Sequence, residues 1–557
     1  MLKIKQMVSG VITGMDEAHN GLLRIGKDIV LVRHVLKQEE VRVRIVRRIA
    51  KGYIGEVVEI KRASPFRIPV KCPIYEHCGS CQLLHMNAQG QRVFKNQSMQ
   101  ALCDRAKGMK LQTEDIVMME EPWQYRNKMI IGFQKDRQRR IQAGFYEEFS
   151  HRIIPYKRCP LHPEVCDSII AGIVELMGKL HIEPYNEDQR KGLIRHVVVR
   201  YGAVSKQIMI VLVLNSNVFP ARRNFIQELR KRFPQITTIV QNVNTRKTSV
   251  VLGDEERVLY GPGYIEDVLC GMTFRISAKS FYQINHEQTE VLYQRSVELL
   301  ELSGKETVLD AYCGIGTIGM YVSRFVKQVI GVEINRDAVE DAKINAKINQ
   351  IPNIRFVCED AGRYMTRLAA EKKRLDVVIM DPPRSGSSEG FIKSLVRMKP
   401  KQVLYISCNP QTQIRDLQMF ERMGYRVQGK LVPVDMFPHT VHVETVVLLS
   451  HKKADSYIHI DVEFGEGEGK IPVDSIAKRA EAYKPKEKVT YKMIKEYIEA
   501  KYGFKVHTAY IAEVKRNLGL PMYDAPNAVE ELKQPRKHPT PEKVEAIKDA
   551  LRYFAVI

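Results

Sequence analysis

Apolar and polar residues alternate in the first part of the chain, in short segments separated by glycine. Between Lys5 and Ile60 these segments read VSGVITGM, GLLRIGKDIVLV, EEVRVRIVRRI and GYIGEVVEI. A period of two with turn residues at the breaks is typical of antiparallel strands that bury one face. The pattern therefore predicts a small antiparallel, OB-like β-barrel or a curled sheet over residues 1–63.

Residues 64–268 show a less regular mixture of short strands and helices. The apolar segments NKMIIGFQ, HVVVRYG, QIMIVLVLN and TTIVQNVN predict strands, and the stretch Phe225–Arg232 predicts a helix. We therefore expect a central mixed α/β domain. A polar, helix-like segment near 87–108 is a candidate to pack on the following domain rather than on its neighbours in the sequence.

Helices and strands alternate regularly from about residue 290 to residue 450. The predicted strands are TVLDAY, QVIGVEI, IRFVCED, LDVVIMD, QVLYISC and VHVETVVLL. Continuous apolar strands that alternate with helices are typical of a doubly wound, mostly parallel sheet. The sequence thus predicts an α/β domain over residues 269–450. A C-terminal extension of unknown role follows at 451–557, in which VTYKMIKEYIEAKYG predicts a helix.

The composition describes a globular chain with a strong positive charge. Its 557 residues include 87 lysines and arginines against 65 aspartates and glutamates, a formal net charge of +22. Such an excess favours an anionic partner, although charge scattered for solubility explains the same number. No apolar stretch approaches the roughly 18 residues of a membrane helix. With no signal peptide in MLKIKQMVSGVITG, we expect a monomeric, cytoplasmic protein without a membrane partner.

The predicted barrel carries a large share of this charge. Residues 1–71 hold 15 lysines and arginines against 7 aspartates and glutamates, with Arg42, Arg44, Arg47 and Arg48 on one strand and its exit. A basic small barrel is a common platform for single-stranded nucleic acid. A solvated basic edge explains the cluster equally well, so the cluster alone leaves both interpretations open.

Acidic residues stand at the ends of several predicted strands. Asp310 precedes the turn Cys313–Gly316, and Glu333 ends the next strand. A glycine turn before a helix offers free backbone N–H groups, and an acid at the tip of the second strand suits a pair of ribose hydroxyls. Together with Asp360 and Asp381, this edge looks like the S-adenosylmethionine site of a class I methyltransferase fold. The absence of a third glycine argues against NAD.

The fifth predicted strand ends at Cys408, one strand from Asp381 and beside the same crevice. A free cysteine is more often buried filler than a nucleophile, but a strand end before Asn409 and Pro410 allows exposure and activation. Here the sequence resembles the RNA uracil-5 methyltransferases, in particular the 23S ribosomal RNA branch with an N-terminal TRAM barrel and an iron–sulfur cluster. The resemblance covers residues 1 to about 450, through FYQIN, DAYCGIG, DPPRSG, SCNP and HVETV in the family order.

The resemblance implies a covalent mechanism that uses S-adenosylmethionine and an RNA substrate. The thiolate of Cys408 would add to uracil C6, C5 would take the methyl group, and Glu444 would remove the C5 proton to give 5-methyluridine. Gln283 resembles the family residue between the uracil edge and the cofactor. Tyr312 would lie beside the cofactor, and Asp381 would contact both cofactor and uracil.

Rival functions differ at individual residues. Adenine-N6 enzymes have an aromatic residue after the DPP motif, where this chain has Arg384, and RNA cytosine-5 enzymes carry a cysteine in this loop, which DPPRSG lacks. A uracil-5 methyltransferase for tRNA is a closer alternative, although in the family pattern that branch lacks the basic barrel and the cysteine cluster. A second alternative is a non-catalytic iron–sulfur RNA-binding protein, which would have no use for Cys408 and Glu444.

A cluster of cysteines lies just after the predicted barrel. Cys72, Cys78 and Cys81 follow one another within CPIYEHCGSC, and Cys159 in KRCP is a fourth candidate. Four thiolates in this arrangement suit a zinc site, which the spacing alone favours, or an iron–sulfur cluster. The family resemblance implies a [4Fe–4S] cluster on these four residues. Cys103 and Cys166 are rival fourth ligands, and neither precedes a proline.

Overall fold

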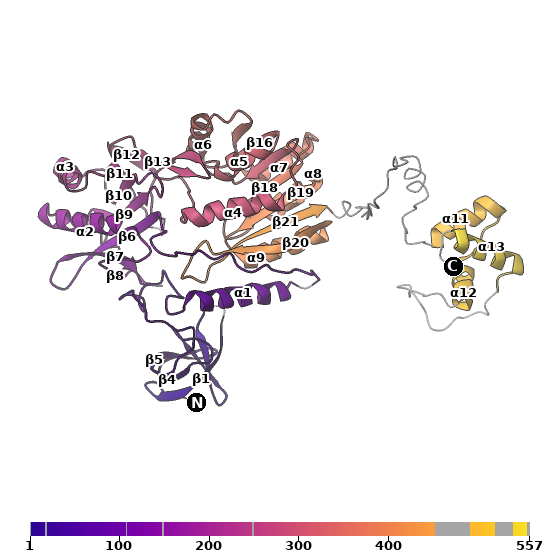
Figure 1. The fold of residues 1–557 in the computed structure, drawn as a ribbon, viewed down its shortest axis with the longest axis horizontal. Coiled ribbons are helices and arrows are strands. Elements are labelled where there is room, and N and C mark those ends of the chain that lie inside the picture. Colours follow the sequence, from indigo (N-terminus) through magenta and orange to yellow (C-terminus); the bar gives the residue numbers. More distant parts are fainter. Residues whose placement is uncertain are drawn as a thin grey trace, which may run out of the picture. The chain divides into compact units, whose positions relative to one another are not determined.

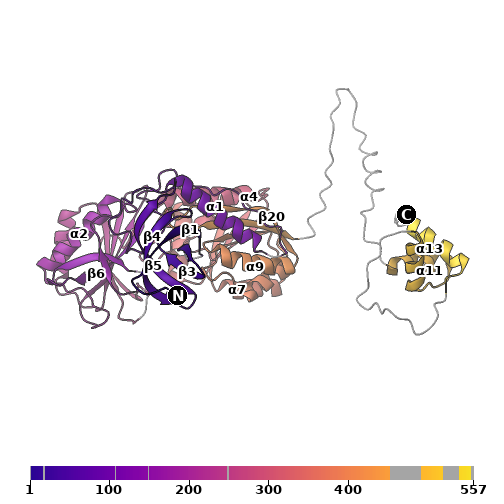
Figure 2. The same ribbon diagram turned by 90° about the horizontal axis from the view of Figure 1, so that it is seen from below.

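The computed structural model describes residues 2–16, 19–106, 108–147, 150–247, 250–451, 491–518 and 538–553. The chain forms two compact units, Met1–Ile458 and His459–Ile557, and each is described by itself. Figures 1 and 2 show the first unit from two directions, with the N-terminal barrel beneath the junction of two larger sheets.

The N-terminal strands close into a barrel, as their pattern predicts. The order around the barrel is β1-β2-β3-β5-β4. Its strands are β1 (Met7–Met15), β2 (Gly21–Ile25), β3 (Asp28–Val32), β4 (Glu40–Ile49) and β5 (Gly52–Arg62). Along β4 the valines at 41 and 43 point into the barrel core while Arg42 and Arg44 are exposed, so the basic side chains lie on the outer surface.

Helix α1 (Ala88–Asp104) links the barrel to the C-terminal part of the first unit. The side chain of Asn87 caps it by accepting a hydrogen bond from Gly90 N at 2.8 Å. At the other end of the helix, Cys103 is buried in the same apolar cluster as Leu309 and Phe420. The segment near 87–108 therefore packs on the domain that follows much later in the sequence.

The second sheet has seven strands in the order β12-β11-β10-β9-β6-β7-β8. Its strands are β6 (Lys128–Lys135), β7 (Ile141–Tyr146), β8 (Ile153–Pro155), β9 (Ile194–Tyr201), β10 (Ile208–Leu214), β11 (Ile236–Val243) and β12 (Glu255–Tyr260). Helices α2 (Glu164–Lys179) and α3 (Arg222–Arg232) contribute to its apolar core. A hairpin of β13 (Tyr264–Leu269) and β14 (Met272–Ser277) follows and spans the predicted boundary at 268/269.

The third sheet is doubly wound, in the order β17-β16-β15-β18-β19-β21-β20. Its strands are β15 (Thr307–Ala311), β16 (Gln328–Glu333), β17 (Ile354–Cys358), β18 (Val377–Met380), β19 (Gln402–Ser407), β20 (Tyr425–Val434) and β21 (Glu444–His451). The first five are parallel, and β21 lies antiparallel between β19 and β20. The predicted α/β domain is confirmed, but strand β20 was missing from the prediction.

Helices connect the strands of this sheet. They are α4 (His286–Leu299), α5 (Thr317–Val322), the 3-10 turn η1 (Ser323–Phe325), α6 (Arg336–Ile348), α7 (Ala361–Ala370), α8 (Glu389–Met398) and α9 (Pro410–Arg422). The strand order reverses between β15 and β18, where the connections run to opposite sides of the sheet. In open α/β sheets, the carboxyl ends of the strands at such a reversal form the crevice that binds ligands.

The second unit contains helices α11 (Tyr491–Tyr502), α12 (Thr508–Asn517) and α13 (Pro541–Tyr553). Their apolar faces share a core that includes Ile498, Ile511 and Ile547. Helix α11 confirms the predicted helix over the part of VTYKMIKEYIEAKYG that is described, while Val489 and Thr490 lie outside the described residues. Among the described helices of the whole chain, none combines the length and the apolar character needed to cross a membrane.

Candidate active site and cysteine pocket

Strand register brings Cys408 and Glu444 together at the carboxyl edge of the third sheet. Ser407, the last residue of β19, pairs with Thr445 of the antiparallel strand β21. The residues one step beyond this pair are Cys408 and Glu444, which therefore lie side by side. A hydrogen bond of 3.2 Å from Thr445 Oγ1 to the Ser407 carbonyl supports this pairing. Because β21 runs antiparallel, its first residue lies at the edge where the parallel strands end.

The loop after β18 adds Asp381 and Arg384 to the same place. Burial, together with the charges of Glu444 and Asp381, raises the pKa of the Cys408 thiol to about 11, while the Arg384 guanidinium acts to lower it. Burial and Asp381 also hold the pKa of Glu444 well above its usual range, again against Arg384. The four side chains thus form one electrostatically linked group.

The buried carboxyl of Asp310 extends this group toward the turn after β15. Burial raises the pKa of Asp381. Burial also raises the pKa of Asp310 well above its usual range, and the charges of Asp381 and Glu333 add to that effect. Carboxyls from three neighbouring strands therefore face a common crevice at this edge.

The turn between β15 and α5 is tight. Tyr312, Gly314 and Gly316 have φ angles of 67°, 54° and 85°. Glu333 lies beside this turn, because its Oε2 accepts a hydrogen bond from Gly314 N at 3.1 Å. The phenol of Tyr312 lies 3.2 Å from Ser387 Oγ, in the loop that also carries Arg384. Glycine and αL backbone at such a turn allow close approach by a ligand.

The other two predicted cofactor residues occupy different positions. Asp360 caps helix α7, where its carboxylate accepts a hydrogen bond from Arg363 N at 3.0 Å. Burial raises the pKa of Tyr312, and the charge of Asp360 adds to this rise. Gln283 lies in the segment before α4, where its backbone carbonyl accepts a hydrogen bond from Asn127 Nδ2 at 2.7 Å. The role of each toward a cofactor stays a prediction.

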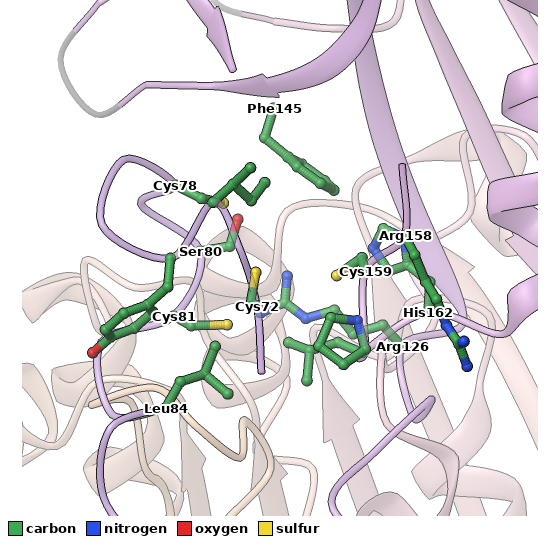
Figure 3. Close-up of a pocket in the computed structure, with 14 residues that line it drawn as sticks. Cys72, Cys78, Ser80, Cys81, Leu84, Arg126, Phe145, Arg158, Cys159 and His162 are labelled. Atoms are coloured by element: carbon green, nitrogen blue, oxygen red, sulfur yellow. The ribbon is translucent and has the colours of Figure 1, made fainter. Parts of the chain in front are cut away.

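The four predicted cysteine ligands line a single pocket (Figure 3). Cys72, Cys78 and Cys81 come from the segment after the barrel, and Cys159 comes from the segment between β8 and α2. Burial raises the pKa of Cys81, and the thiols of Cys159, Cys78 and Cys72 raise it further, while the guanidinium of Arg126 lowers it. The four thiols therefore lie close enough to influence one another.

Within the described part of the chain, no group of three or more His, Cys, Asp or Glu side chains has the geometry of a metal-ion site. The cysteine pocket thus brings four possible thiolate ligands together, but they are not arranged as the ligands of a bound metal ion. The rival ligands Cys103 and Cys166 do not line this pocket: both are buried, in α1 and in α2 respectively. The structure thus separates Cys159 from its two alternatives.

Sequence reasoning missed two features of these sites. Arg384 was used only to argue against an adenine enzyme, and its contact with Cys408 depends on two loops that meet in space. A second, larger groove beside the cysteine pocket is lined by Lys71, Trp123, Lys157 and Arg158. Trp123, the only tryptophan of the chain, stacks on His439 with ring centroids 4.3 Å apart. The scattered positions of these residues gave no motif.

The sheet order, the glycine turn and the acidic edge together define an S-adenosylmethionine-dependent methyltransferase fold. A family model described as tRNA (uracil-5-)-methyltransferase matches residues 145–452, more than half of the chain. An uncharacterized RNA methyltransferase from Halalkalibacterium halodurans is 40% identical over 445 residues, which cover 79% of this chain and 96% of that protein. The chain therefore belongs to the tRNA (uracil-5-)-methyltransferase family and is an RNA methyltransferase.

Further similar proteins agree with this family. An uncharacterized RNA methyltransferase from Clostridium tetani is 38% identical over 441 residues, covering 79% of this chain and 95% of that protein. The solved structure of a Pyrococcus abyssi tRNA (uracil-54, C5)-methyltransferase in complex with S-adenosyl-L-homocysteine aligns with a TM-score of 0.65 at 28% identity. That alignment covers 79% of this chain and 100% of the archaeal chain.

Proposed function

We propose that this protein methylates C5 of a uridine in 23S ribosomal RNA, with Cys408 as nucleophile and Glu444 as general base. The observation that carries the proposal is the register of β19 and β21, which sets the two side chains next to each other beside Asp381 and Arg384. A thiol and a carboxyl at one strand edge are the two groups that substitution at uracil C5 requires.

The reaction divides into addition and elimination. The Cys408 thiolate forms a bond from Sγ to uracil C6, and the electron pair of the C5–C6 double bond moves onto the C4 carbonyl as an enolate. S-adenosylmethionine, when bound, supplies a methyl group on a sulfonium centre to which the enolate carbon C5 is nucleophilic. Glu444 then takes the C5 proton, the double bond re-forms, and Cys408 leaves as a thiolate.

The residues at the carboxyl edge fit an S-adenosylmethionine molecule. Glu333 stands at the tip of the second strand, where a carboxylate suits a pair of ribose hydroxyls, although its two oxygens also accept hydrogen bonds from Gly314 N and Asn335 N. Ile334 next to it is 69% exposed and offers an apolar surface for an adenine ring. Tyr312, Asp360 and Asp381 would complete this binding edge.

We further propose that Cys72, Cys78, Cys81 and Cys159 hold a [4Fe–4S] cluster. The support is chemical: four thiols line one pocket, and Arg126 lines it too, where its positive charge stabilises thiolates. Zinc remains the rival occupant for the same donor set. The cluster would fix the loop of the three clustered cysteines to the segment of Cys159, and it has no part in the steps at Cys408.

The choice of ribosomal RNA rests on the basic barrel and the cysteine pocket, which the family resemblance links to the ribosomal RNA branch. A tRNA substrate is the second candidate, because an archaeal tRNA (uracil-54, C5)-methyltransferase aligns over 79% of this chain. Both candidates use the same residues at the catalytic edge. The substrate therefore has to be determined by presenting both RNAs to the enzyme.

Trapping with fluorinated RNA tests the chemistry and the substrate together. Transcripts of 23S ribosomal RNA and of tRNA that contain 5-fluorouridine are each incubated with the enzyme and S-adenosylmethionine. The true substrate should form a stable protein–RNA adduct, since fluorine at C5 blocks the elimination. We expect the adduct with the ribosomal transcript, and Cys408→Ala should form none. Glu444→Gln on ordinary RNA should stall as a covalent methylated species. Adduct formation by Cys408→Ala would refute the assignment of the nucleophile.

A further inference from the structure

Lys95 is a fully buried lysine far from its acidic partner in the sequence. It lies on α1 with a side chain that is 0% exposed, and its Nζ is 2.5 Å from Asp435 Oδ1, 340 positions later in the chain. Asp435 follows β20 directly, and its side chain is 1% exposed. Taking two charges out of water costs several kcal/mol per ion, and their mutual attraction often does not offset this cost. A pair this deeply buried therefore contributes little to the net stability of the fold.

The ammonium group of Lys95 contacts three residues of one short loop. Besides Asp435, its Nζ lies 3.5 Å from the Phe437 carbonyl and 3.4 Å from the His442 carbonyl. A lysine ammonium has three N–H donors, and these three acceptors match that number. Asp435 and Phe437 lie near the beginning of the loop 435–443, which connects β20 to β21, and His442 lies near its end. Lys95 therefore ties both ends of this loop to one point.

The residue that follows this loop is Glu444, the first residue of β21. His442, whose carbonyl Lys95 contacts, precedes Glu444 by two positions, and Val443 between them packs in a small cluster with Met99 of α1. The direction in which the chain enters β21 sets where the Glu444 carboxyl points. A displacement of the loop would therefore move the carboxyl relative to the uracil C5 proton.

Other contacts also hold the loop. Near its beginning, Asp435 N donates to the Val117 carbonyl at 2.9 Å and Asn285 Nδ2 donates to the Met436 carbonyl at 3.1 Å, but neither bond joins the beginning of the loop to its end. Gln91, one turn before Lys95 on α1, contacts His439 Nδ1 at 3.2 Å, and Tyr125 donates to the Pro438 carbonyl at 3.1 Å. These bonds fix the middle of the loop from outside. Lys95 closes it from within, next to Asp435 and His442.

We propose that Lys95 is a positioning residue that holds the loop 435–443 so that Glu444 can remove the C5 proton. The inference rests on the proposed function of Glu444 as general base. It assigns a catalytic consequence to a side chain on a helix that precedes the methyltransferase sheet by some 200 residues and carries none of the family motifs. It also predicts which step suffers: elimination, and neither thiol addition nor methyl transfer.

The test separates proton removal from methyl transfer. A mixture of in vitro transcribed 23S ribosomal RNA and tRNA, labelled with tritium at uridine C5, is incubated with the full-length protein and S-adenosylmethionine that carries a labelled methyl group. In the wild type, methyl transfer and tritium release should proceed together. In a single turnover, with enzyme in excess over RNA, methyl transfer by Lys95→Met should stay within about threefold while tritium release falls on the order of 100-fold, the effect of a misplacement of about 1 Å.

Two further variants separate positioning from folding. Lys95→Met leaves Asp435 buried without its cation and should lower the melting temperature, whereas the double variant Lys95→Met with Asp435→Leu removes the stranded charge and should recover that loss. Both variants should accumulate the covalent methylated RNA adduct. The matched control Asn87→Ala weakens the same helix at its cap and should lower the melting temperature while the adduct stays at the wild-type level.

Each outcome decides between the two proposals. If the wild type and Glu444→Gln behave as expected but the Lys95 variants slow methyl transfer and tritium release equally, or slow neither, then Lys95 has no positioning role. If the double variant recovers both the melting temperature and tritium release, the pair is structural only. If the wild type forms no adduct and releases no tritium, the proposed function itself fails.

Discussion

The charge state of Cys408 is set by the side chains around it. Burial, Glu444 and Asp381 raise the pKa of the thiol to about 11, and Arg384 opposes them. The same guanidinium opposes the rise in the pKa of Glu444. Arg384 therefore favours the anionic forms of both groups that the proposed reaction uses. Neither the DPPRSG motif nor its spacing indicates this role, because it arises only where two loops meet.

Replacement of Arg384 should change the reactivity of Cys408. Below a pKa of about 11, the thiolate fraction of Cys408 rises about tenfold per pH unit, and so should its alkylation by iodoacetamide. Arg384→Met removes a group that lowers this pKa, so the pKa should rise and alkylation should be slower at each pH from 7 to 10. Mass spectrometry of the Cys408 peptide after short pulses measures the rate.

The control removes an arginine of the same domain that lies on the surface. Arg397 on α8 is exposed, so Arg397→Met should leave the alkylation profile of Cys408 unchanged. If Arg384→Met also had the wild-type profile, the guanidinium would have no influence on the thiol, and the electrostatic link between the two loops would be refuted.

At the scale of elements, two glycines of one turn differ in what surrounds them. Gly314 and Gly316 both have positive φ, at 54° and 85°. A Cβ atom at Gly314 would meet nothing within 4 Å, whereas at Gly316 it would lie 2.8 Å from Met320 Cε and 2.9 Å from the Phe356 ring. The first position is constrained by backbone conformation only, and the second by conformation and packing.

The two alanine variants should therefore differ in stability. Gly314→Ala should cost about 1 kcal/mol, the strain of a side chain in the left-handed region. Gly316→Ala should cost roughly 2 to 4 kcal/mol, because overpacking against α5 and β17 adds to the same strain. Denaturant unfolding measures both values, with Gly314→Ala as the matched control. Equal losses would show that the turn relaxes away from Phe356.

The periodicity of apolar residues predicted most strands, because their burial follows from local alternation. Strand β20 was missed because its pattern is broken: its pairing with β21 shifts between Gln428 and Val432, around Gly429 with φ 65°. The burial of Lys95 could not be predicted for another reason. Its helix is polar, and its burial depends on Asp435, 340 positions away. Local patterns cannot report a partner at that distance.

At the scale of the whole molecule, the cysteine pocket joins segments that are distant in the sequence. The spacing of Cys72, Cys78 and Cys81 identified three members, and the proline after Cys159 singled out the fourth. The structure places all four around one pocket, which Arg126 also lines. The metal itself could not be read from spacing, since zinc and iron–sulfur clusters use the same thiolates.

Metal analysis of the full-length protein should distinguish the two occupants. Protein purified without oxygen should contain about four iron atoms per chain and absorb broadly in the visible range, as expected for a [4Fe–4S] cluster. Cys72→Ser should lose most of this iron. Cys358→Ser, at an exposed cysteine outside the pocket, should keep it. Stoichiometric zinc without iron in the wild type would replace the iron–sulfur assignment with a zinc site.

The barrel offers a candidate RNA-binding surface, because its core is apolar and its basic side chains lie on the outside. Arg42, Arg44, Arg47 and Arg48 are all exposed on β4. Arg44 already contacts Glu56 Oε2 at 2.6 Å, so part of its charge is balanced within the protein. If RNA phosphates bind this surface, about three of the four arginine charges should contribute fully to the electrostatic part of RNA affinity.

Neutralising this surface should weaken RNA binding without slowing the chemical step. When all four arginines are changed to glutamine, the slope of log affinity against log salt should flatten by roughly 2 to 3, because fewer counterions are released. Turnover at saturating RNA should persist, since the catalytic edge lies in another sheet and uniform binding affects affinity rather than the reaction. A control variant loses the same four positive charges from the methyltransferase region and should keep the wild-type salt slope. In it, glutamine replaces four exposed residues: Lys372, Lys373, Arg374 and Arg397. If both variants kept the wild-type salt slope, RNA would bind elsewhere, with the groove of Lys71, Trp123 and Lys157 as the next surface to test.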